Sequence, residues 1–272
     1  MEKPTVRCLI TGAASGIGEA IAHRFGRAGM EIVGVDVDAA GSERVVADLR
    51  RAGIGAGFET VDLTDSEQHE TLVARMSPLD TVVHSAGTSC VGGFGDAPEL
   101  EQQRVIDLNL EAPIRLTTEL LRREKIEPGG SLVFLSSLSR FLSYPGASVY
   151  AATKDGLAAY ARGLAVALAP RRIHVATVYP GPTRTPHARR FSPDPDAEAR
   201  RMLPETLARI VYLAVRRRRR VVIPGTANKM LATLGHIAPT LAGRLMKRVI
   251  YERLPHPARS SGGSSSPGSE SG

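Results

Sequence analysis

Blocks of consecutive apolar residues alternate along the chain with segments in which apolar positions recur every three or four residues. The apolar blocks predict strands buried on both faces, at residues 5–10, 31–35, 56–61, 79–84, 131–136, 173–179 and 220–223. The periodic segments predict helices at residues 17–28, 40–52, 66–76, 99–125, 148–169 and 204–216. This alternation predicts an α/β fold in one domain, with a doubly wound parallel sheet of about seven strands covered on both faces.

A glycine-rich segment follows the first predicted strand and leads directly into a helix. Small residues there let the backbone approach a pyrophosphate, and free amides at the helix start attract its negative charge. A strand, a glycine turn and a helix start in this order predict a Rossmann-like dinucleotide site. The residues of the turn that we expect to contact the cofactor are Gly12, Ser15, Gly16, Ile17 and Gly18.

Asp36 ends the second predicted strand, eighteen residues after Gly18. A carboxylate at this place accepts hydrogen bonds from both ribose hydroxyls of an adenosine and repels a 2′-phosphate. We therefore expect NAD as the cofactor, with NADP less favoured. The alternative for Asp36 is a loop carboxylate or a helix cap without a ligand.

Tyr150 and Lys154 lie four residues apart in a predicted helix, so their side chains share one face. An ammonium group beside a phenol favours the phenolate and lowers the pKa of the phenol. Such a tyrosine passes a proton to or from a carbonyl or an alcohol near neutral pH. The same spacing also arises by chance, as a solvated face beside a packed aromatic ring.

Pro113 interrupts the long predicted helix at residues 99–125. A proline has no N–H to donate to the carbonyl four residues earlier, which is that of Asn109. We expect a kink that frees this carbonyl and leaves room for a water molecule. The alternative is a helical asparagine with only a local hydrogen bond.

These motifs, in this order over residues 5–225, resemble the short-chain dehydrogenase/reductase family. The resemblance implies a catalytic tetrad of Asn109, Ser137, Tyr150 and Lys154. It also implies further cofactor contacts, with Tyr150 and Lys154 taking part: Asp62 and Leu63 at the adenine, Ser85, Ala86 and Gly87 after the fourth strand, and Pro180, Gly181, Thr183 and Thr185 near the nicotinamide. Two residues depart from the pattern, because asparagine usually stands in place of Ser85 and Tyr179.

The resemblance implies NAD-dependent interconversion of a secondary alcohol and a ketone. Hydride moves at the nicotinamide, Tyr150 transfers the proton, Ser137 polarises the substrate oxygen and Asn109 orders a proton relay. Two alternatives stay open: an NADPH-dependent ketoreductase of lipid or secondary metabolism, and a catalytically idle protein that senses NAD. We expect a lipophilic substrate, which would be contacted by Ser139, Tyr144, Tyr179, His187 and Phe191. The alternative for Tyr179 is a ring packed at the edge of the core. The alternative for His187 and the nearby arginines is a loop whose side chains face solvent.

The domain organisation follows from these assignments. Residues 1–225 form the NAD(P)-binding catalytic domain, which includes a mobile substrate loop at residues 186–203. Residues 226–256 form an amphipathic helical extension, broken at Pro239, and residues 257–272 are too polar and glycine-rich to fold. The family also implies a homodimer or homotetramer, assembled through the predicted helices at residues 99–125 and 148–169.

Composition narrows the remaining possibilities. The chain has 35 Lys and Arg, 28 Asp and Glu, a net charge of +7 and two cysteines. We expect no metal site and no disulfide, and a cytoplasmic location, because paired-cysteine patterns and apolar leader or spanning segments do not occur.

The basic extension and the arginine run at residues 216–220 have three interpretations. They form a cap or subunit contact, or they contact an anionic membrane surface. Nucleic-acid binding is the least favoured, because no aromatic-rich basic motif occurs.

Overall fold

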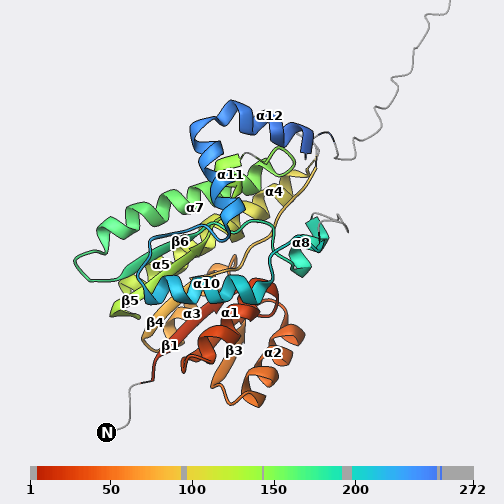
Figure 1. Cartoon of the computed structure of the whole chain (residues 1–272). Coiled ribbons are helices and arrows are strands. Elements are labelled where there is room, and N and C mark those ends of the chain that lie inside the picture. Colours follow the sequence, from red (N-terminus) through yellow and green to blue (C-terminus); the bar gives the residue numbers. More distant parts are fainter. Residues whose placement is uncertain (1–4, 93–96, 143, 192–197, 250–251, 253–272) are drawn as a thin grey trace, which may run out of the picture.

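The structure, a computed structural model, describes residues 5–92, 97–142, 144–191, 198–249 and 252. Within these residues seven parallel strands form one sheet, in the order β3-β2-β1-β4-β5-β6-β7 (Figure 1). The strands are β1 (Arg7–Thr11), β2 (Glu31–Asp36), β3 (Ala56–Thr60), β4 (Leu79–His84), β5 (Ile126–Leu135), β6 (His174–Val178) and β7 (Val221–Val222). The chain winds outward from β1 to β3 and then returns to β4, so the doubly wound sheet predicted from the sequence is confirmed.

Helices cover both faces of the sheet (Figure 1). One layer contains α1 (Gly16–Gly26), α2 (Ala39–Arg51) and α10 (Pro204–Arg216), and the other contains α3 (Ser66–Arg75), α5 (Ala112–Arg122) and α7 (Ser148–Ala167). Successive side chains of a strand point to opposite faces, so Cys8 and Ile10 of β1 pack in the first layer while Leu9 packs in the second. Both faces are therefore buried, which explains why the strands read as continuous apolar blocks.

The predicted helix at residues 99–125 is three segments. These are α4 (Glu99–Ile106), a π-helical turn η1 (Asp107–Glu111) and α5. Ala112 donates its N–H to the carbonyl of Asp107, one residue farther back than in an α-helix. Pro113 cannot donate an N–H to Asn109, and the chain responds by widening one turn rather than by a sharp kink.

Four shorter or later helices complete the described chain. They are α6 (Ser139–Leu142), α8 (Pro186–Phe191), α11 (Thr226–Ile237) and α12 (Pro239–Val249). α11 and α12 lie together at one end of the molecule, at the top of Figure 1, where they pack on α6. Among the described helices, none is both long and apolar enough to cross a bilayer.

The division into residues 1–225 and 226–256 stays a prediction, although α11 and α12 fall within the second range. The tail at residues 257–272 and part of the predicted substrate loop, residues 192–197, lie outside the described residues. Cys8 and Cys90 are buried free thiols, and burial raises the pKa of both.

Candidate active site

The glycine turn after β1 brings two loops into close contact. Gly12 has a φ of +68°, which favours glycine, and a Cβ on it would lie 2.8 Å from the Cα of Ala86. A Cβ on Gly18 would collide with the carbonyl oxygen of Gly12, so the start of α1 presses against the turn. Ser15 is the N-cap of α1, and its side chain caps no helical N–H. The first amides of α1 are therefore available to an anion.

Thr11 ties this turn to the loop after β4. Its hydroxyl oxygen accepts hydrogen bonds of 3.1 Å from the backbone N–H groups of both Ser85 and Ala86. The loop therefore holds its shape through main-chain groups. Serine at position 85 is compatible with the turn, because this support does not need an asparagine side chain.

Asp36 lies at the end of β2, beside the glycine turn. One carboxylate oxygen accepts a hydrogen bond of 3.0 Å from the N–H of Ala14, and the other accepts one of 3.1 Å from the N–H of Asp38. A carboxylate offers about four acceptor positions, so ribose hydroxyls can still bind. Asp36 therefore has a structural role in the turn, and its contact with a ribose stays a prediction.

Arg44 of α2 contacts the same turn, which the sequence reasoning missed. Its guanidinium donates to the carbonyl oxygen of Ala14 at 3.0 Å and forms a bidentate pair with Glu19 of α1, at 2.7 and 3.0 Å. The hydrogen bond that Arg44 donates to Glu19 raises the pKa of Arg44. No local sequence pattern signals this pair, because its members lie on different helices.

Asp62 and Leu63, which the resemblance places at the adenine, both make contacts within the protein. The carboxylate of Asp62 accepts bonds of 2.9 and 2.7 Å from the N–H and hydroxyl of Thr64. The Leu63 side chain is buried in the core under α3 and α5, and its carbonyl accepts a hydrogen bond from Arg115. Contact with an adenine through these two residues stays a prediction, and the Leu63 side chain is committed to the core.

Asn109 is fully buried in η1 and holds the loop after β4. Its Oδ1 accepts from the N–H of Thr88 at 2.8 Å, and its Nδ2 donates to the carbonyl of Thr88 at 2.9 Å and to the hydroxyl of Thr153 at 3.2 Å. The side-chain amide is thus occupied by protein groups. Thr88 and Thr153 were not predicted, although Thr153 directly precedes Lys154.

Lys154 is 5% exposed and lies close to Asn109. A Cβ added to Gly87 would sit 3.0 Å from Asn109 Oδ1 and 3.3 Å from Lys154 Nζ, so this glycine leaves room beside both groups. Nζ donates a 3.1 Å hydrogen bond to the carbonyl of Leu135. Burial lowers the pKa of Lys154 to about 8. Lys154 is therefore an ammonium group at neutral pH, although its pKa lies not far above neutrality.

The side chains of Tyr150 and Ser137 are hydrogen-bonded to each other. Burial nevertheless raises the pKa of Tyr150, and the hydrogen bond from Ser137 opposes this rise only in part. The expectation that Lys154 lowers this pKa is wrong for the structure. The Lys154 Nζ lies 5.7 Å from the centroid of the tyrosine ring, and burial is the largest cause of the raised pKa of Tyr150.

The segment after β6 lies against both the glycine turn and α11. A Cβ on Gly16 would be 3.2 Å from Cγ2 of Thr185, and Gly181 faces the side chain of Asn228, which was not predicted. Thr183 and Thr185 are buried, and Thr185 accepts a hydrogen bond from the N–H of Ala188 at the start of α8. The carbonyl of Pro180 accepts a hydrogen bond from the N–H of Leu138. This segment therefore closes one side of the site.

The predicted substrate residues do not all face one space. Tyr179 is 3% exposed and its ring packs 5.2 Å from that of Phe141, so it is the packed core-edge tyrosine rather than a pocket residue. Ser139 has a buried hydroxyl without a hydrogen-bond partner, and its N–H donates to Ser137. Tyr144 lies near enough to Tyr150 to raise its pKa.

His187 and Phe191 lie together on α8, with ring centroids 4.8 Å apart. His187 is exposed to solvent, yet partial enclosure lowers its pKa to about 4, and the positive charges of Lys154 and Arg190 add to this effect. His187 therefore stays neutral at physiological pH. The influence of Lys154 indicates that this side of α8 is near the site.

A buried histidine pair behind the site was also missed. His84 ends β4, stacks on Phe134 at 4.7 Å and shares a 2.9 Å hydrogen bond with the hydroxyl of Thr117. Burial lowers the pKa of His84 to about 3, and nearby His69, also buried, contributes to this shift. Both imidazoles are neutral at physiological pH, and His84 contributes to the packing between β4 and α5.

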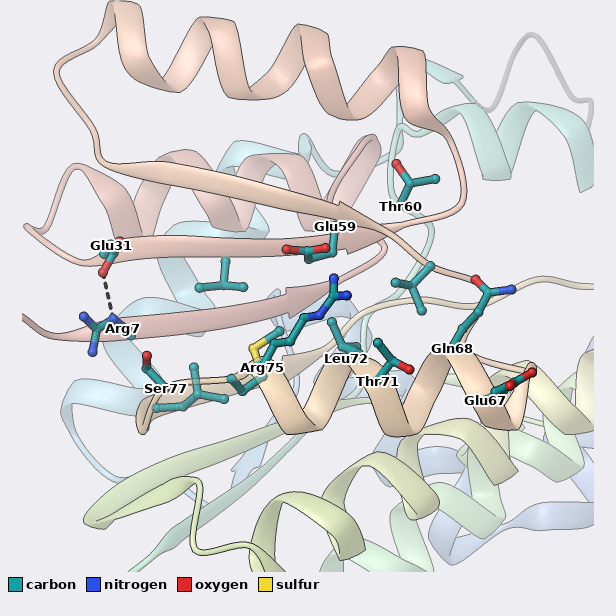
Figure 2. A pocket seen from close by; sticks show the side chains of 14 residues that line it. Arg7, Glu31, Glu59, Thr60, Glu67, Gln68, Thr71, Leu72, Arg75 and Ser77 are labelled. Carbon is teal, nitrogen blue, oxygen red and sulfur yellow. Dashed lines mark hydrogen bonds and ion pairs between the residues drawn. The ribbon is translucent and has the colours of Figure 1, made fainter.

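A separate hollow lies away from these residues. Figure 2 shows it between α3 and the strands β2 and β3, with Arg7, Glu31, Glu59 and Arg75 among its charged lining residues. Its volume is about 590 Å³. Its lining contains no residue of the predicted site. The residues of the predicted site lie instead at the carboxyl edge of the sheet.

The residues at that edge fit a dinucleotide. Close backbone contacts at Gly12 and Gly18, the uncapped start of α1 and the space beside Gly87 form a cradle that added side chains would fill. Asp36 lies at one end of this cradle, and Lys154 and Tyr150 lie at the other. Within the described part of the chain, no group of three or more His, Cys, Asp or Glu side chains is arranged to hold a metal ion.

Comparisons with known proteins agree with this geometry. The family model for short chain dehydrogenases matches residues 7–196. A 1-deoxy-11-beta-hydroxypentalenate dehydrogenase from Streptomyces exfoliatus is 33% identical over 196 residues, which cover 68% of this chain and 70% of that protein. A cyclopentanol dehydrogenase from a Comamonas strain is 29% identical over 204 residues, 73% of this chain and 81% of that protein.

A solved structure has the same overall arrangement. The short-chain dehydrogenase from Sphingobium yanoikuyae, in complex with NADPH, superposes with a TM-score of 0.76 at 29% sequence identity. The match covers 87% of this chain and 95% of that one.

Proposed function

The chain belongs to the short-chain dehydrogenase family, and on that premise we propose that it is an NAD-dependent oxidoreductase that interconverts a secondary alcohol and a ketone. The observation that carries the proposal is the convergence of four side chains next to the glycine turn. Ser137 is hydrogen-bonded to Tyr150, and Lys154 and Asn109 both lie beside Gly87. A dehydrogenase needs a proton-transfer group, a polarising hydroxyl and a cation together beside a cofactor cradle.

Each part of the cradle has a role in holding the cofactor. The amides at the start of α1 would bind the pyrophosphate, and Asp36 would accept the ribose hydroxyls of the adenosine. Lys154 would bind the hydroxyls of the second ribose, and the segment from Pro180 to Thr185 would orient the nicotinamide amide. When bound, the nicotinamide group supplies or accepts the hydride.

The side chains of this chain move and hold the proton. In the direction of reduction, Ser137 donates a hydrogen bond to the ketone oxygen and polarises it, and the phenol of Tyr150 gives its proton to the same oxygen. The product is an alcohol and a tyrosine phenolate, which the ammonium group of Lys154 stabilises. In oxidation the phenolate takes the hydroxyl proton instead. Asn109 positions the loop at Thr88 and would support the return of the proton through Lys154.

The surroundings of Asp36 support NAD. A 2′-phosphate would meet a carboxylate that the turn already holds in place through the N–H of Ala14. The cation that could compensate, Arg44, is neutralised by its bidentate pair with Glu19. The repulsion between Asp36 and a 2′-phosphate is therefore not offset by the positive charge of Arg44.

Two observations support the alternative of an NADPH-dependent ketoreductase. The pKa of Tyr150 is raised, so the phenol is a proton donor at neutral pH, which suits reduction. The structural relative from Sphingobium yanoikuyae is a complex with NADPH. Measuring the dissociation constants of NADH and NADPH separates the two, and a clear preference for NADPH would overturn the argument from Asp36.

We propose a lipophilic substrate. Apolar residues form the wall that follows Ser137, and Leu138 and Leu142 pack there against α11 and α12. The relatives include dehydrogenases named for cyclopentanol and for a pentalenate derivative. Assembly as a homodimer or homotetramer through α4, α5 and α7, and the cytoplasmic location, stay predictions.

The proposal is tested with a panel of secondary alcohols and ketones, followed by the absorbance of the reduced nicotinamide. We expect turnover with at least one lipophilic pair. The Tyr150→Phe variant removes only the phenolic hydroxyl, so we expect turnover to fall at least about a thousandfold while the NAD dissociation constant changes less than about threefold. NAD binding without turnover on any substrate would favour the idle NAD-sensing protein, and absence of dinucleotide binding would overturn both.

A further inference from the structure

The helices α11 and α12 present two different faces. Their inner faces carry the small side chains of Ala232, Gly235 and Ala242, which pack against Leu138 and Leu142. A Cβ on Gly235 would collide with the carbonyl oxygen of Phe141, so α11 lies directly against α6. The inner faces are therefore fully used by the fold, and the pair is fixed to the wall beside Ser137.

The outer face of α11 and α12 is apolar and open to solvent. It consists of Met230, Ile237, Leu241 and Leu245, with exposed fractions of 74%, 75%, 54% and 39%. Met230 and Ile237 are seven residues apart, and Leu241 and Leu245 are four apart, so each pair shares a side of its helix. Because α11 and α12 contact each other, these four large exposed apolar side chains are gathered on one part of the molecule.

Basic side chains accompany this outer face. Lys229 is next to Met230, and Arg244 and Arg248 lie one turn apart beside Leu241 and Leu245. All three basic residues are exposed. Residues 226–250 contain no Asp or Glu, in a chain that has 28 acidic residues. The apolar residues are therefore flanked by positive charge that no acidic side chain of either helix balances.

The arginine run at residues 216–220 belongs to a different part of the molecule. It precedes β7, at the amino end of the strands, where Arg218 donates hydrogen bonds to the carbonyls of Gly129 and Arg172. The helices α11 and α12 follow the carboxyl end of β7. The arginine run is thus held at the amino ends of β5 and β6 by Arg218, whereas α11 and α12 pack on α6.

We propose that the outer face of α11 and α12 seats the protein on an anionic membrane surface. Apolar side chains would enter the boundary between headgroups and acyl chains, while Lys229, Arg244 and Arg248 would contact lipid phosphates. A second copy of the chain fits less well, because pairing this face with itself would bring the same cations together without acidic partners. This contact is peripheral and needs no membrane-spanning segment.

The contact would bring the candidate active site near the lipid. α11 packs on α6, which begins two residues after Ser137, and Asn228 of α11 faces Gly181. A lipophilic substrate dissolved in the bilayer would then meet the wall beside Ser137 at short range. This last step rests on the proposed function, whereas the membrane contact itself does not.

The test is co-sedimentation of the full chain with vesicles of phosphatidylcholine alone or with phosphatidylglycerol added. We expect binding to the anionic vesicles that weakens as salt rises, because exposed charges are screened. Each basic residue near a lipid surface contributes about 1 kcal/mol, or roughly fivefold in partitioning, so Arg244→Gln with Arg248→Gln should weaken binding about 25-fold. The matched control, Arg217→Gln with Arg220→Gln, removes the same charge from the arginine run and should leave binding unchanged.

A second variant tests the apolar part. Met230→Ser with Ile237→Ser should reduce binding at least about tenfold, whereas Leu100→Ser, which removes an apolar side chain that is 76% exposed elsewhere, should not. Sedimentation velocity without lipid tests whether a second copy of the chain binds this face instead. The proposal is overturned by absence of binding to anionic vesicles, by equal loss in the two arginine variants, or by a change of oligomeric mass in the apolar variant. NAD binding, measured on the same samples, reports separately on the proposed function.

Discussion

At the scale of single residues, burial sets the ionisation of the groups that would do the chemistry. Lys154 is protonated at neutral pH but its pKa is lowered to about 8, and the pKa of Tyr150 is raised. Both shifts have desolvation as their largest cause. The site therefore holds a neutral phenol and a destabilised ammonium group side by side, so that a proton can leave the first and be replaced through the second.

The buried ammonium of Lys154 lowers the stability of the fold. Its folded pKa of about 8 lies below the ordinary value of 10.5, so the cost is fully present below pH 8 and disappears as pH rises through 10.5. We expect Lys154→Met to raise the free energy of unfolding at pH 7 by on the order of 1–3 kcal/mol while abolishing turnover. Loss of the hydrogen bond to Leu135 limits the gain.

Urea unfolding at pH 7 and near pH 10 checks this expectation. The advantage of the variant should shrink at the higher pH. Lys229→Met, at an exposed position, is the control and should show no such dependence. An equal gain at both pH values would mean that packing, not desolvation, explains the effect.

The ion pair of Arg44 with Glu19 leads to a second prediction, which concerns the preference between NAD and NADP. Glu19→Gln removes the carboxylate that neutralises Arg44, so the guanidinium becomes available to a 2′-phosphate. We expect the NADP dissociation constant to fall about tenfold and that of NAD to stay within about twofold. Calorimetric titration of both cofactors measures this. Glu43→Gln removes an exposed carboxylate from α2 as a control, and parallel changes in both cofactors would contradict the idea.

At the scale of elements, η1 shows how one residue shapes a site. Pro113 lacks the N–H that an α-helix would direct at Asn109, and the helix widens into a π turn at this point. Asn109 is thereby held against Thr88 and Thr153, between the loop after β4 and α7. The position of a functional side chain thus depends on an irregular turn that neighbouring elements stabilise.

The interface between β4 and α5 is expected to be sensitive to acid. The pKa of His84 is lowered from 6.5 to about 3, so the unfolded chain binds a proton that the folded chain does not. Stability is retained above pH 6.5 and falls as pH drops towards 3, by up to about 1.4 kcal/mol per pH unit. We expect His84→Asn to reduce this slope, measured by urea unfolding between pH 7 and 4.

A matched variant separates this effect from general acid denaturation. His236 is exposed on α11, so His236→Asn should leave the slope unchanged. If both variants have the same pH dependence as the unmodified chain, buried His84 does not govern acid stability.

At the scale of the whole molecule, the last two helices join the domain through a contact that only a small residue allows. Gly235→Ala would place a methyl group on the carbonyl of Phe141 and push α11 away from α6. We expect a loss of on the order of 1–3 kcal/mol in stability and a lower kcat/KM, with NAD binding retained. Gly243→Ala on α12 meets open space, and by helix propensity it should gain up to about 1 kcal/mol.

Thermal unfolding and turnover of the two glycine variants provide the measurement. If Gly235→Ala were as stable and active as the unmodified chain, the extension would be loosely attached. In that case α11 and α12 would not link a membrane surface to the site.

The amino-acid sequence by itself determined the parallel sheet, its glycine turn and the order of the motifs at its carboxyl edge. These are local properties: burial on both faces gives apolar blocks such as that of β1, and a tight turn needs Gly12. Only the tertiary structure decided which polar groups are already engaged and how they ionise. Asp36 binds the N–H of Ala14, Asn109 binds Thr88, Tyr179 packs on Phe141, and Arg218 of the arginine run binds Gly129. These outcomes depend on contacts between distant segments and on the exclusion of water, which no local pattern contains.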